Sequence, residues 1–161
     1  MSNMRLTQNA KIVVGAVRID TTGAAVTGDY VSMKGNSHLT ITIMQGAWAG
    51  GTPAVTLKQA VDVAGTSEKA LSFTKYWSGV ALTQDLLTET AVVSDTFNLT
   101  ATANTFTVLE VNASDLDADN NFDCVRVGIA SPGSNADLIC VHYNLTGTRY
   151  PQSSPPSAII D

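Results

Sequence analysis

The stretch HLTITIMQGAWAGGTPAVTLKQA, residues 38–60, decides how the rest of the chain is interpreted. It contains G-x-x-x-x-G, from Gly46 to Gly51, followed by a threonine, which is close to a phosphate-binding loop. Such a loop needs a lysine where Thr52 stands and a following helix whose amides point at the anion. Here both flanks alternate apolar and polar residues, and Pro53 opens the second flank. The stretch therefore predicts a β-hairpin with a glycine-rich loop, not a nucleotide site.

Antiparallel pairing of the two flanks gathers apolar side chains on one face of the predicted hairpin: Leu39, Ile41, Ile43, Val55 and Leu57. Trp48 stands at the tip, between two alanines. Two interpretations of it stay open. The indole either folds back on its own loop or contacts another protein, since tryptophan is enriched where proteins meet.

The same alternation recurs along the chain and predicts strands rather than helices. In 78–94 the segment TQDLLTET is compatible with one short helix. About eight strands separated by Gly-, Asn- and Asp-rich turns predict an all-β fold, an antiparallel β-sandwich or jelly roll with extended N- and C-terminal arms. The expected strands cover 11–19, 29–33, 38–44, 54–61, 70–77, 96–100, 105–111, 122–129 and 137–145.

Composition agrees with a sheet protein and excludes several functions. The 161 residues fit one domain, and 20 Thr and 16 Val favour strands. Charged residues make up only 14%, and nine Lys and Arg scattered singly in a chain of net charge −5 form no basic stripe, so no nucleic acid is expected as a partner. No apolar run approaches the ~18 residues of a membrane span, and no secretory signal is visible, so no membrane partner is expected.

The chain is expected to divide into an N-terminal arm (1–11), a sandwich domain (12–146) and a Pro-rich C-terminal arm (147–161). After Gly147 the sequence TRYPQSSPPSAIID carries three prolines, which do not suit a central strand. Ile159 and Ile160 have no evident place in the same core. This segment is either a frayed tail or an arm that lies on a neighbouring subunit.

The segment ASDLDADNNFD, residues 113–123, invites a calcium interpretation because Asp115, Asp117 and Asp119 alternate. Asn120 stands where glycine would make the sharp bend, and Arg126 stands where the bidentate glutamate belongs. An Asx-rich turn is the favoured interpretation, with no metal site.

Two cysteines are too few for a disulfide framework or an all-thiolate zinc site. A hairpin centred on Pro132 would set Cys124 opposite Cys140, where a disulfide is conceivable, although two buried, reduced thiols are expected in a cytosolic product. Cys140 and His142 share a strand face, but residues two apart lie about 7 Å from each other, too far for an activating hydrogen bond. No catalytic residue, cofactor or enzyme activity is expected.

Four stretches carry a resemblance to a known family. DYVSMKGNSHLTITIMQG (29–46), TPAVTLKQAVDVAGTSEKALSF (52–73), EVNASDLDADNNFDCVRVGIAS (110–131) and LTGTRYPQSSPPSAIID (145–161) resemble small virion proteins of tailed phages. The resemblance spans roughly 29–77 and 106–161, in order. Jelly-roll members of that kind act as cement or decoration subunits, clamping the major capsid protein from outside the head.

The resemblance implies a virion structural protein on the head surface, assembled in the host cytoplasm. Its expected partners are the major capsid protein and itself, as a homodimer or homotrimer. The rival interpretations are a carbohydrate- or receptor-binding jelly roll of a head or tail fibre, and a neck or adaptor component. The expected protein contacts are Trp48, Arg149, Tyr150, Pro151, Pro155, Pro156, Ile159 and Ile160.

Overall fold

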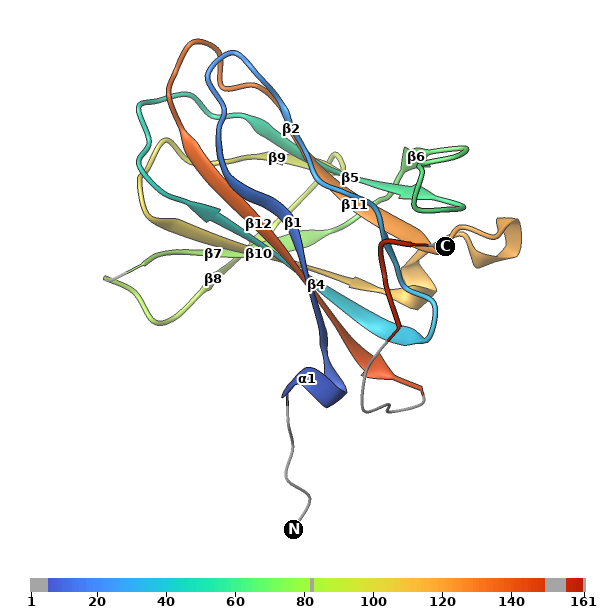
Figure 1. Cartoon of the computed structure of the whole chain (residues 1–161). Coiled ribbons are helices and arrows are strands. Elements are labelled where there is room, and N and C mark those ends of the chain that lie inside the picture. Colours follow the sequence, from blue (N-terminus) through green and yellow to red (C-terminus); the bar gives the residue numbers. More distant parts are fainter. Residues whose placement is uncertain (1–5, 82, 150–155, 161) are drawn as a thin grey trace.

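The computed structural model describes residues 6–81, 83–149 and 156–160, apart from the side chain of Arg18. Two antiparallel sheets pack as a sandwich, with twelve strands in this part of the chain (Figure 1). Sheet A runs in the spatial order β1 (Lys11–Asp20), β12 (Leu138–Thr148), β4 (Asn36–Gln45), β10 (Thr105–Asn112), β7 (Lys75–Val80) and β8 (Thr88–Ala91).

Sheet B is smaller and more broken. Its path runs β2 (Val26–Thr27), β11 (Cys124–Ile129), β5 (Ala54–Ala60) and β6 (Lys69–Ala70), with β3 (Val31–Ser32) also paired to β11 and β9 (Thr96–Asn98) also paired to β5. The described helices are short: α1 (Leu6–Asn9) and the 3-10 turns η1 (Ala113–Asp115) and η2 (Ala118–Asn120). In the described ranges no helix has the length and apolar character of a membrane-crossing segment.

Outside the β7–β8 hairpin the chain changes sheet at each step except from β2 to β3 and from β5 through β6 to β9, where it stays in sheet B. It passes from β1 in sheet A to β2 and β3 in sheet B, then to β4, β5, β9, β10, β11 and β12 in turn. The order β1–β12–β4–β10 opposite β2/β3–β11–β5–β9 is that of a jelly roll. The β7–β8 hairpin extends sheet A beyond β10. The predicted all-β sandwich or jelly roll is confirmed.

Both predicted hairpins are wrong. The strand at 38–44 lies in sheet A and the strand at 54–61 in sheet B, so β4 and β5 are not paired. Likewise β11 and β12 lie in different sheets, so the turn around Pro132 is a crossover and Cys124 does not face Cys140. Apolar alternation gives the buried face of a strand, but it does not say whether two such faces lie side by side in one sheet or meet across a sandwich.

The segment 78–94 also differs from the expectation. Its start completes β7 and its end forms β8, which pairs with β7, and no helix forms in the described part of it. The expected strand at 70–77 is divided between β6 and β7, which lie in different sheets. Short edge strands such as β2, β6 and β8 carry too few residues for a periodic signal.

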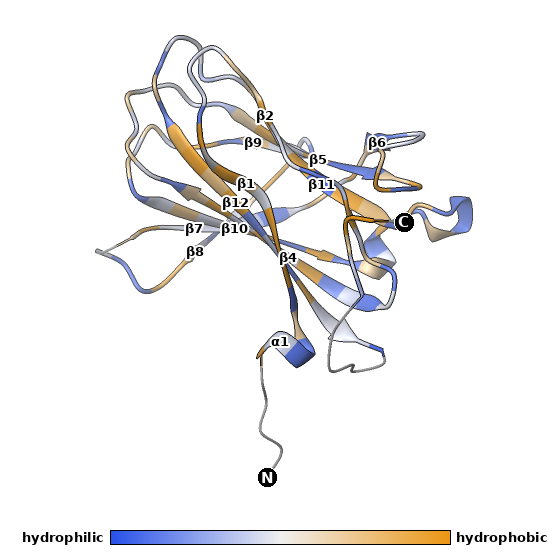
Figure 2. Cartoon of the chain, in the orientation of Figure 1, coloured by the Kyte–Doolittle hydropathy of each residue, from blue (hydrophilic) through white to orange (hydrophobic). Residues whose placement is uncertain are grey.

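The core lies between the inner faces of the sheets. Leu39, Ile41 and Ile43 from β4 and Val55 and Leu57 from β5 are all essentially inaccessible to solvent. These residues share one core although their strands belong to different sheets. Hydrophobic colouring follows long parts of β12, β1 and β11, whereas the colours around β6 are mixed (Figure 2). Each such side chain contributes about 1.5–3 kcal/mol through burial.

Tyr143 on β12 ties the two sheets together. Its ring is buried, and its hydroxyl oxygen accepts a hydrogen bond from the amide of Val127 on β11 at 3.1 Å. Burial raises the pKa of Tyr143. A Cβ added at Gly15 would lie 2.4 Å from the ring, and one at Gly28 would lie 2.3 Å from the hydroxyl oxygen. The two glycines therefore leave the space that the tyrosine fills.

Candidate contact surface

The outer face of sheet A carries apolar side chains toward one end of its central strands and along its margins. Strand register aligns its outward side chains into rows that cross the sheet. The first row contains Phe106, Met44 and Cys140; the second contains Trp77, Val108, Thr42, His142 and Val14; the third contains Glu110, Thr40, Asn144 and Ile12. We call these three rows, together with Val17 and Leu87, the apolar face.

The two margins of the apolar face are its most exposed parts. On β1 the exposed fractions are 52% for Ile12, 45% for Val14 and 73% for Val17. At the other margin Leu87 is 41% exposed, and its side chain lies within 3.2 Å of where a Cβ on Gly79 would stand. An antiparallel sheet normally turns a polar face to water. Contiguous exposed apolar surface on a folded domain is typical of a contact site.

The outer face of sheet B is different. Glu68 accepts hydrogen bonds from Lys58, from Arg126 at 2.6 Å and from the hydroxyl of Tyr30 at 2.9 Å. The Arg126 guanidinium also lies 4.9 Å from the centre of the Tyr30 ring. The bond from Lys58, followed by that from Tyr30, lowers the pKa of Glu68, while burial and the bond to Glu68 raise the pKa of Tyr30 to about 12. We call Tyr30, Lys58, Glu68 and Arg126, with Thr56 beside them, the charged face.

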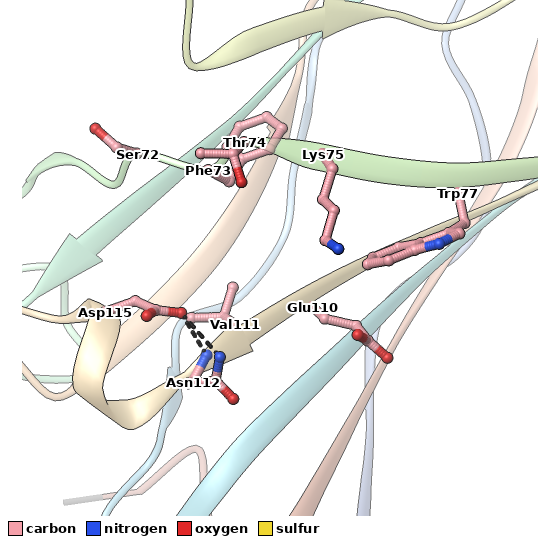
Figure 3. Close-up of a pocket in the computed structure, with 9 residues that line it drawn as sticks. All are labelled: Ser72, Phe73, Thr74, Lys75, Trp77, Glu110, Val111, Asn112 and Asp115. Atoms are coloured by element: carbon pink, nitrogen blue, oxygen red, sulfur yellow. Dashed lines mark hydrogen bonds between the residues drawn. The ribbon is translucent and has the colours of Figure 1, made fainter. Parts of the chain in front are cut away.

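A hollow lies beside Trp77 and Glu110 of the apolar face, next to the polar residues Asn112 and Asp115 (Figure 3). Its lining residues are Ser72, Phe73, Thr74, Lys75, Trp77, Glu110, Val111, Asn112 and Asp115. The Lys75 ammonium stands 5.0 Å from the centre of the Trp77 ring. Phe73 is buried and makes an edge contact with Phe97, so Trp77 is the ring that reaches the outer surface of the hollow.

The Gly46–Gly51 loop does bind a negatively charged group, but that group is a carboxylate of the same chain. The buried carboxylate of Asp137 accepts hydrogen bonds from the amides of Ala49 and Gly50, at 2.5 and 3.2 Å. The Trp48 indole donates to the Gly51 carbonyl at 3.2 Å, and its ring packs against the core. Trp48 is thus folded back on its own loop. Asp137 was missed from the sequence because its partner loop is distant along the chain.

The C-terminal contact candidates are only partly described. Tyr150, Pro151 and Pro155 lie outside the described residues. Arg149 is exposed, and its amide donates to the Gly35 carbonyl at 2.9 Å. The exposed candidates beyond it are Pro156, Ile159 (47% exposed) and Ile160 (71%).

Between these exposed residues Ala158 is buried. Its carbonyl accepts a hydrogen bond from the amide of Ser32 on β3, at 2.7 Å. The end of the described chain is therefore anchored to sheet B, and the two isoleucines project from that anchor.

The cysteines require two corrections. Cys124 is buried as expected, but Cys140 is only half-buried and lies on the apolar face, and no disulfide joins them. The Cys140 Sγ lies 3.5 Å from Nε2 of His142. The geometric reason for excluding a thiol–imidazole contact is thus wrong, because these side chains lean together although their backbone positions are two residues apart.

The aspartate-rich segment forms the predicted Asx-type turn. Asp115 accepts from the amide of Asn112 at 2.8 Å, and Asp117 binds the Asn120 side chain and Lys69. The bond from Lys69, then that from Asn120, lowers the pKa of Asp117. The carboxylates of Asp115 and Asp117 are used within the chain, and no group of three or more metal-ligating side chains occurs among the described residues.

Comparison with known proteins adds one structural likeness. No protein-family model matches the chain, and no curated protein matches it. Among solved structures, YomS, a protein derived from the SPBc2 prophage, aligns over 86% of this chain and 94% of its own, with 13% identity and a TM-score of 0.48. That likeness is slight, and the proposed function rests on the residues of this chain.

Proposed function

We propose that the protein is a non-enzymatic structural component of a phage virion. Its role would be that of a cement or decoration subunit that binds the outside of the major capsid protein lattice, on the head surface, and that associates with itself. The apolar face carries this proposal, because apolar side chains gathered on a sheet surface suit a lasting protein contact better than solvent.

Three further features support a capsid role. The sequence resemblance covers the segments that form β3 to β6 and β10 to β12. The jelly roll is compact and interlaced, which suits a clamp. The exposed Ile159 and Ile160, held in place by Ala158, offer a small apolar anchor. Many copies on a lattice allow each such contact to be modest, because avidity multiplies them.

The test is co-sedimentation of the purified protein with empty heads of the phage that encodes it, assembled without it. Saturation at hundreds of copies per head supports a cement role. A dozen copies or fewer would place the protein at a vertex or in the neck instead, and no binding at all would overturn the capsid role.

A matched pair of variants locates the contact. Ile160→Asp is expected to reduce the bound copies at least about tenfold, because a charge replaces an apolar anchor. Val93→Asp makes the same kind of change at a side chain that is 97% exposed and lies far from Ile160 in the sequence. This variant is expected to bind normally. Equal binding by both variants would remove the C-terminal residues from the contact.

A second candidate is carbohydrate binding, favoured by the hollow in Figure 3. Trp77 offers a ring face, and Glu110, Asn112 and Asp115 bring oxygen and amide groups to the same hollow. That combination is typical of sites that stack a sugar and hydrogen-bond its hydroxyls. A saturable hit on a glycan array that is lost in Trp77→Ala would favour this function over the capsid role.

A further inference from the structure

The apolar face continues to both edges of sheet A without a covering segment in the described chain. β1 and β8 are the terminal strands of the sheet; β1 brings exposed apolar side chains to one margin, and Leu87, directly before β8, lies exposed at the other. In the first two rows Glu89 pairs with Trp77 at the β8 edge and binds Lys75, whose ammonium lies over the Trp77 ring, at 3.2 Å. The positions of these two rows on β10, β4 and β12 carry no carboxylate, lysine or arginine, and Glu110 lies in the third row.

The absence of carboxylates at these positions matters because the chain carries a net charge of −5. Two copies would repel each other on most approaches, since like charges raise the energy of contact. An approach through the first two rows brings together side chains of β4 and β10 such as Met44, Phe106 and Val108, with no carboxylate on these strands in either row. The first two rows thus let a like-charged copy approach without bringing carboxylates of the central strands together.

The size of the face is adequate. The fourteen residues of the apolar face, on strands about 4.8 Å apart and in rows about 6.8 Å apart, give a footprint on the order of 450 Å². Crystal-packing contacts mostly bury less than about 400 Å² per partner, and stable specific interfaces bury about 800 Å². Side chains stand above the plane of the sheet, so the accessible area of the face exceeds its footprint.

The order of the strands in sheet A suggests how two copies fit together. A twofold axis parallel to the strands, between β4 and β10, keeps each row over the same row of the partner. β1 of one copy then covers β8 of the other. Val17, whose place beside Cys140 follows from the register of Ala16 and Ile19, meets the partner's Leu87 in the first row. His142 meets the partner's Trp77 in the second row.

We infer that the apolar face of sheet A binds a second copy of this chain, face to face, in a twofold dimer whose exposed β1 and β8 margins cover each other. Two sheets packed in this way lie about 10 Å apart, as inside a sandwich. The inference gives a surface to the self-association that belongs to the proposed function. Its test uses the isolated protein, so its failure would leave capsid binding standing.

The first test compares one substitution on the two sheets. Thr42 lies at the centre of the apolar face on β4, and Thr56 lies exposed at the centre of the outer face of sheet B on β5. Sedimentation equilibrium should find twice the monomer mass for the unaltered protein. Thr42→Lys should raise the dimer dissociation constant at least about tenfold, because each dimer would bury two lysines, and Thr56→Lys should change it less than about twofold.

The native thiol gives a second readout. Cys140 is half-buried on the apolar face, whereas Cys124 is buried in the fold, so a thiol reagent should report on Cys140. The labelling rate should fall as the protein concentration passes through the dissociation constant, and it should stay constant in Thr42→Lys. A protein that sediments as a monomer at all concentrations, or equal effects of the two lysine substitutions, would overturn the inference.

A mixing experiment tests the arrangement and does not depend on Thr42→Lys folding. Val17→Lys and Leu87→Glu lie at the exposed margins and should each weaken the homodimer. Mixed together, the two variants should form a heterodimer at least about fivefold tighter than either homodimer, since the ammonium introduced on one copy would face the carboxylate introduced on the other. Absence of this preference would rule out the twofold arrangement.

Discussion

The two outer faces of the sandwich differ although their strands alternate in the same way. On sheet B the outward positions hold Lys58, Arg126 and their shared partner Glu68, which pair with one another and meet water. On sheet A the outward positions of the central strands hold Met44, Phe106 and Val108. Alternation therefore establishes which residues face the core, and the chemistry of the remaining positions indicates whether water or another molecule covers them.

The inner faces of the two sheets, by contrast, should contribute similarly to the stability of the fold. Ile41→Ala on β4 and Leu57→Ala on β5 each empty space in the same fully buried core. Each is expected to lower the free energy of unfolding by about 2–5 kcal/mol. Urea denaturation followed by circular dichroism measures both, at concentrations below the dimer dissociation constant.

A loss below ~1 kcal/mol in one of the two variants would contradict a shared core. The sheets would then differ inside as well as outside, and the contrast between their outer faces would need another explanation.

The hydrogen bond between Tyr143 and Val127, which links the two sheets, should have the next largest effect on the free energy of unfolding. Tyr143→Phe keeps the ring and removes the hydroxyl that accepts from the Val127 amide, leaving that buried amide without its partner. The expected loss in unfolding free energy is about 1–3 kcal/mol. Tyr76→Phe is a control, since its ring stacks on Phe97 with centres 3.9 Å apart and retains that stacking. Equal losses in both variants would contradict the bridging role.

Much of this architecture follows from the sequence. Period-two patterns place β1, β4, β5, β10, β11 and β12 within a few residues of their observed bounds, because long strands with one buried face leave a strong pattern. The pairing of those strands does not follow. β4 pairs with β10 and β12, far along the chain, and a local hairpin satisfies the same pattern equally well.

Acid titration separates the charged face from the apolar one. The pKa of Glu68 is lowered in the folded protein, so ionised Glu68 favours the folded state above its unfolded pKa, and this contribution disappears as the pH falls through the folded pKa. The stability difference between the unaltered protein and Glu68→Gln should be constant near neutral pH and should shrink below pH 4.5, the ordinary value for the group. Thermal unfolding from pH 7 to pH 3 measures it.

A difference that persists unchanged to pH 3 would mean that the Glu68 carboxylate is not the group that binds Lys58 and Arg126 in solution. Thr42→Ser on the apolar face removes no titratable group and should follow the unaltered protein throughout.

Salt should produce the smallest effect. Because the first two rows of the apolar face carry no carboxylate, lysine or arginine on β10, β4 and β12, the dimer dissociation constant should change less than about threefold between 50 and 500 mM NaCl. Any change should be towards tighter binding, since screening weakens the repulsion between two chains of net charge −5. Weakening by tenfold or more, measured by sedimentation, would indicate that ion pairs and not apolar contact hold the copies together.

The contact surface was harder to predict than the fold. Its residues come from β1, β4, β7, β10 and β12, so no window of sequence contains them. Trp48 was a predicted contact residue at a loop tip, yet Asp137 holds its loop and its half-buried ring packs against the core. Trp77 lay in a cluster of aromatic residues whose orientation only the pairing of β7 with β10 decides. A signal was available in Val108, Met44 and Phe106, apolar residues at positions that alternation leaves facing outward.

The position of β12 has a consequence for synthesis in the cell. This strand, near the end of the sequence, lies between β1 and β4 and supplies Tyr143 to the centre of the molecule. A ribosome-bound chain that lacks it can bury neither β1 nor the inner face of β4 in the native way. Folding is therefore expected to wait until β12 has left the ribosome and to be slow, as for other folds in which distant segments must pair. Until then the unpaired strands are open to capture by chaperones.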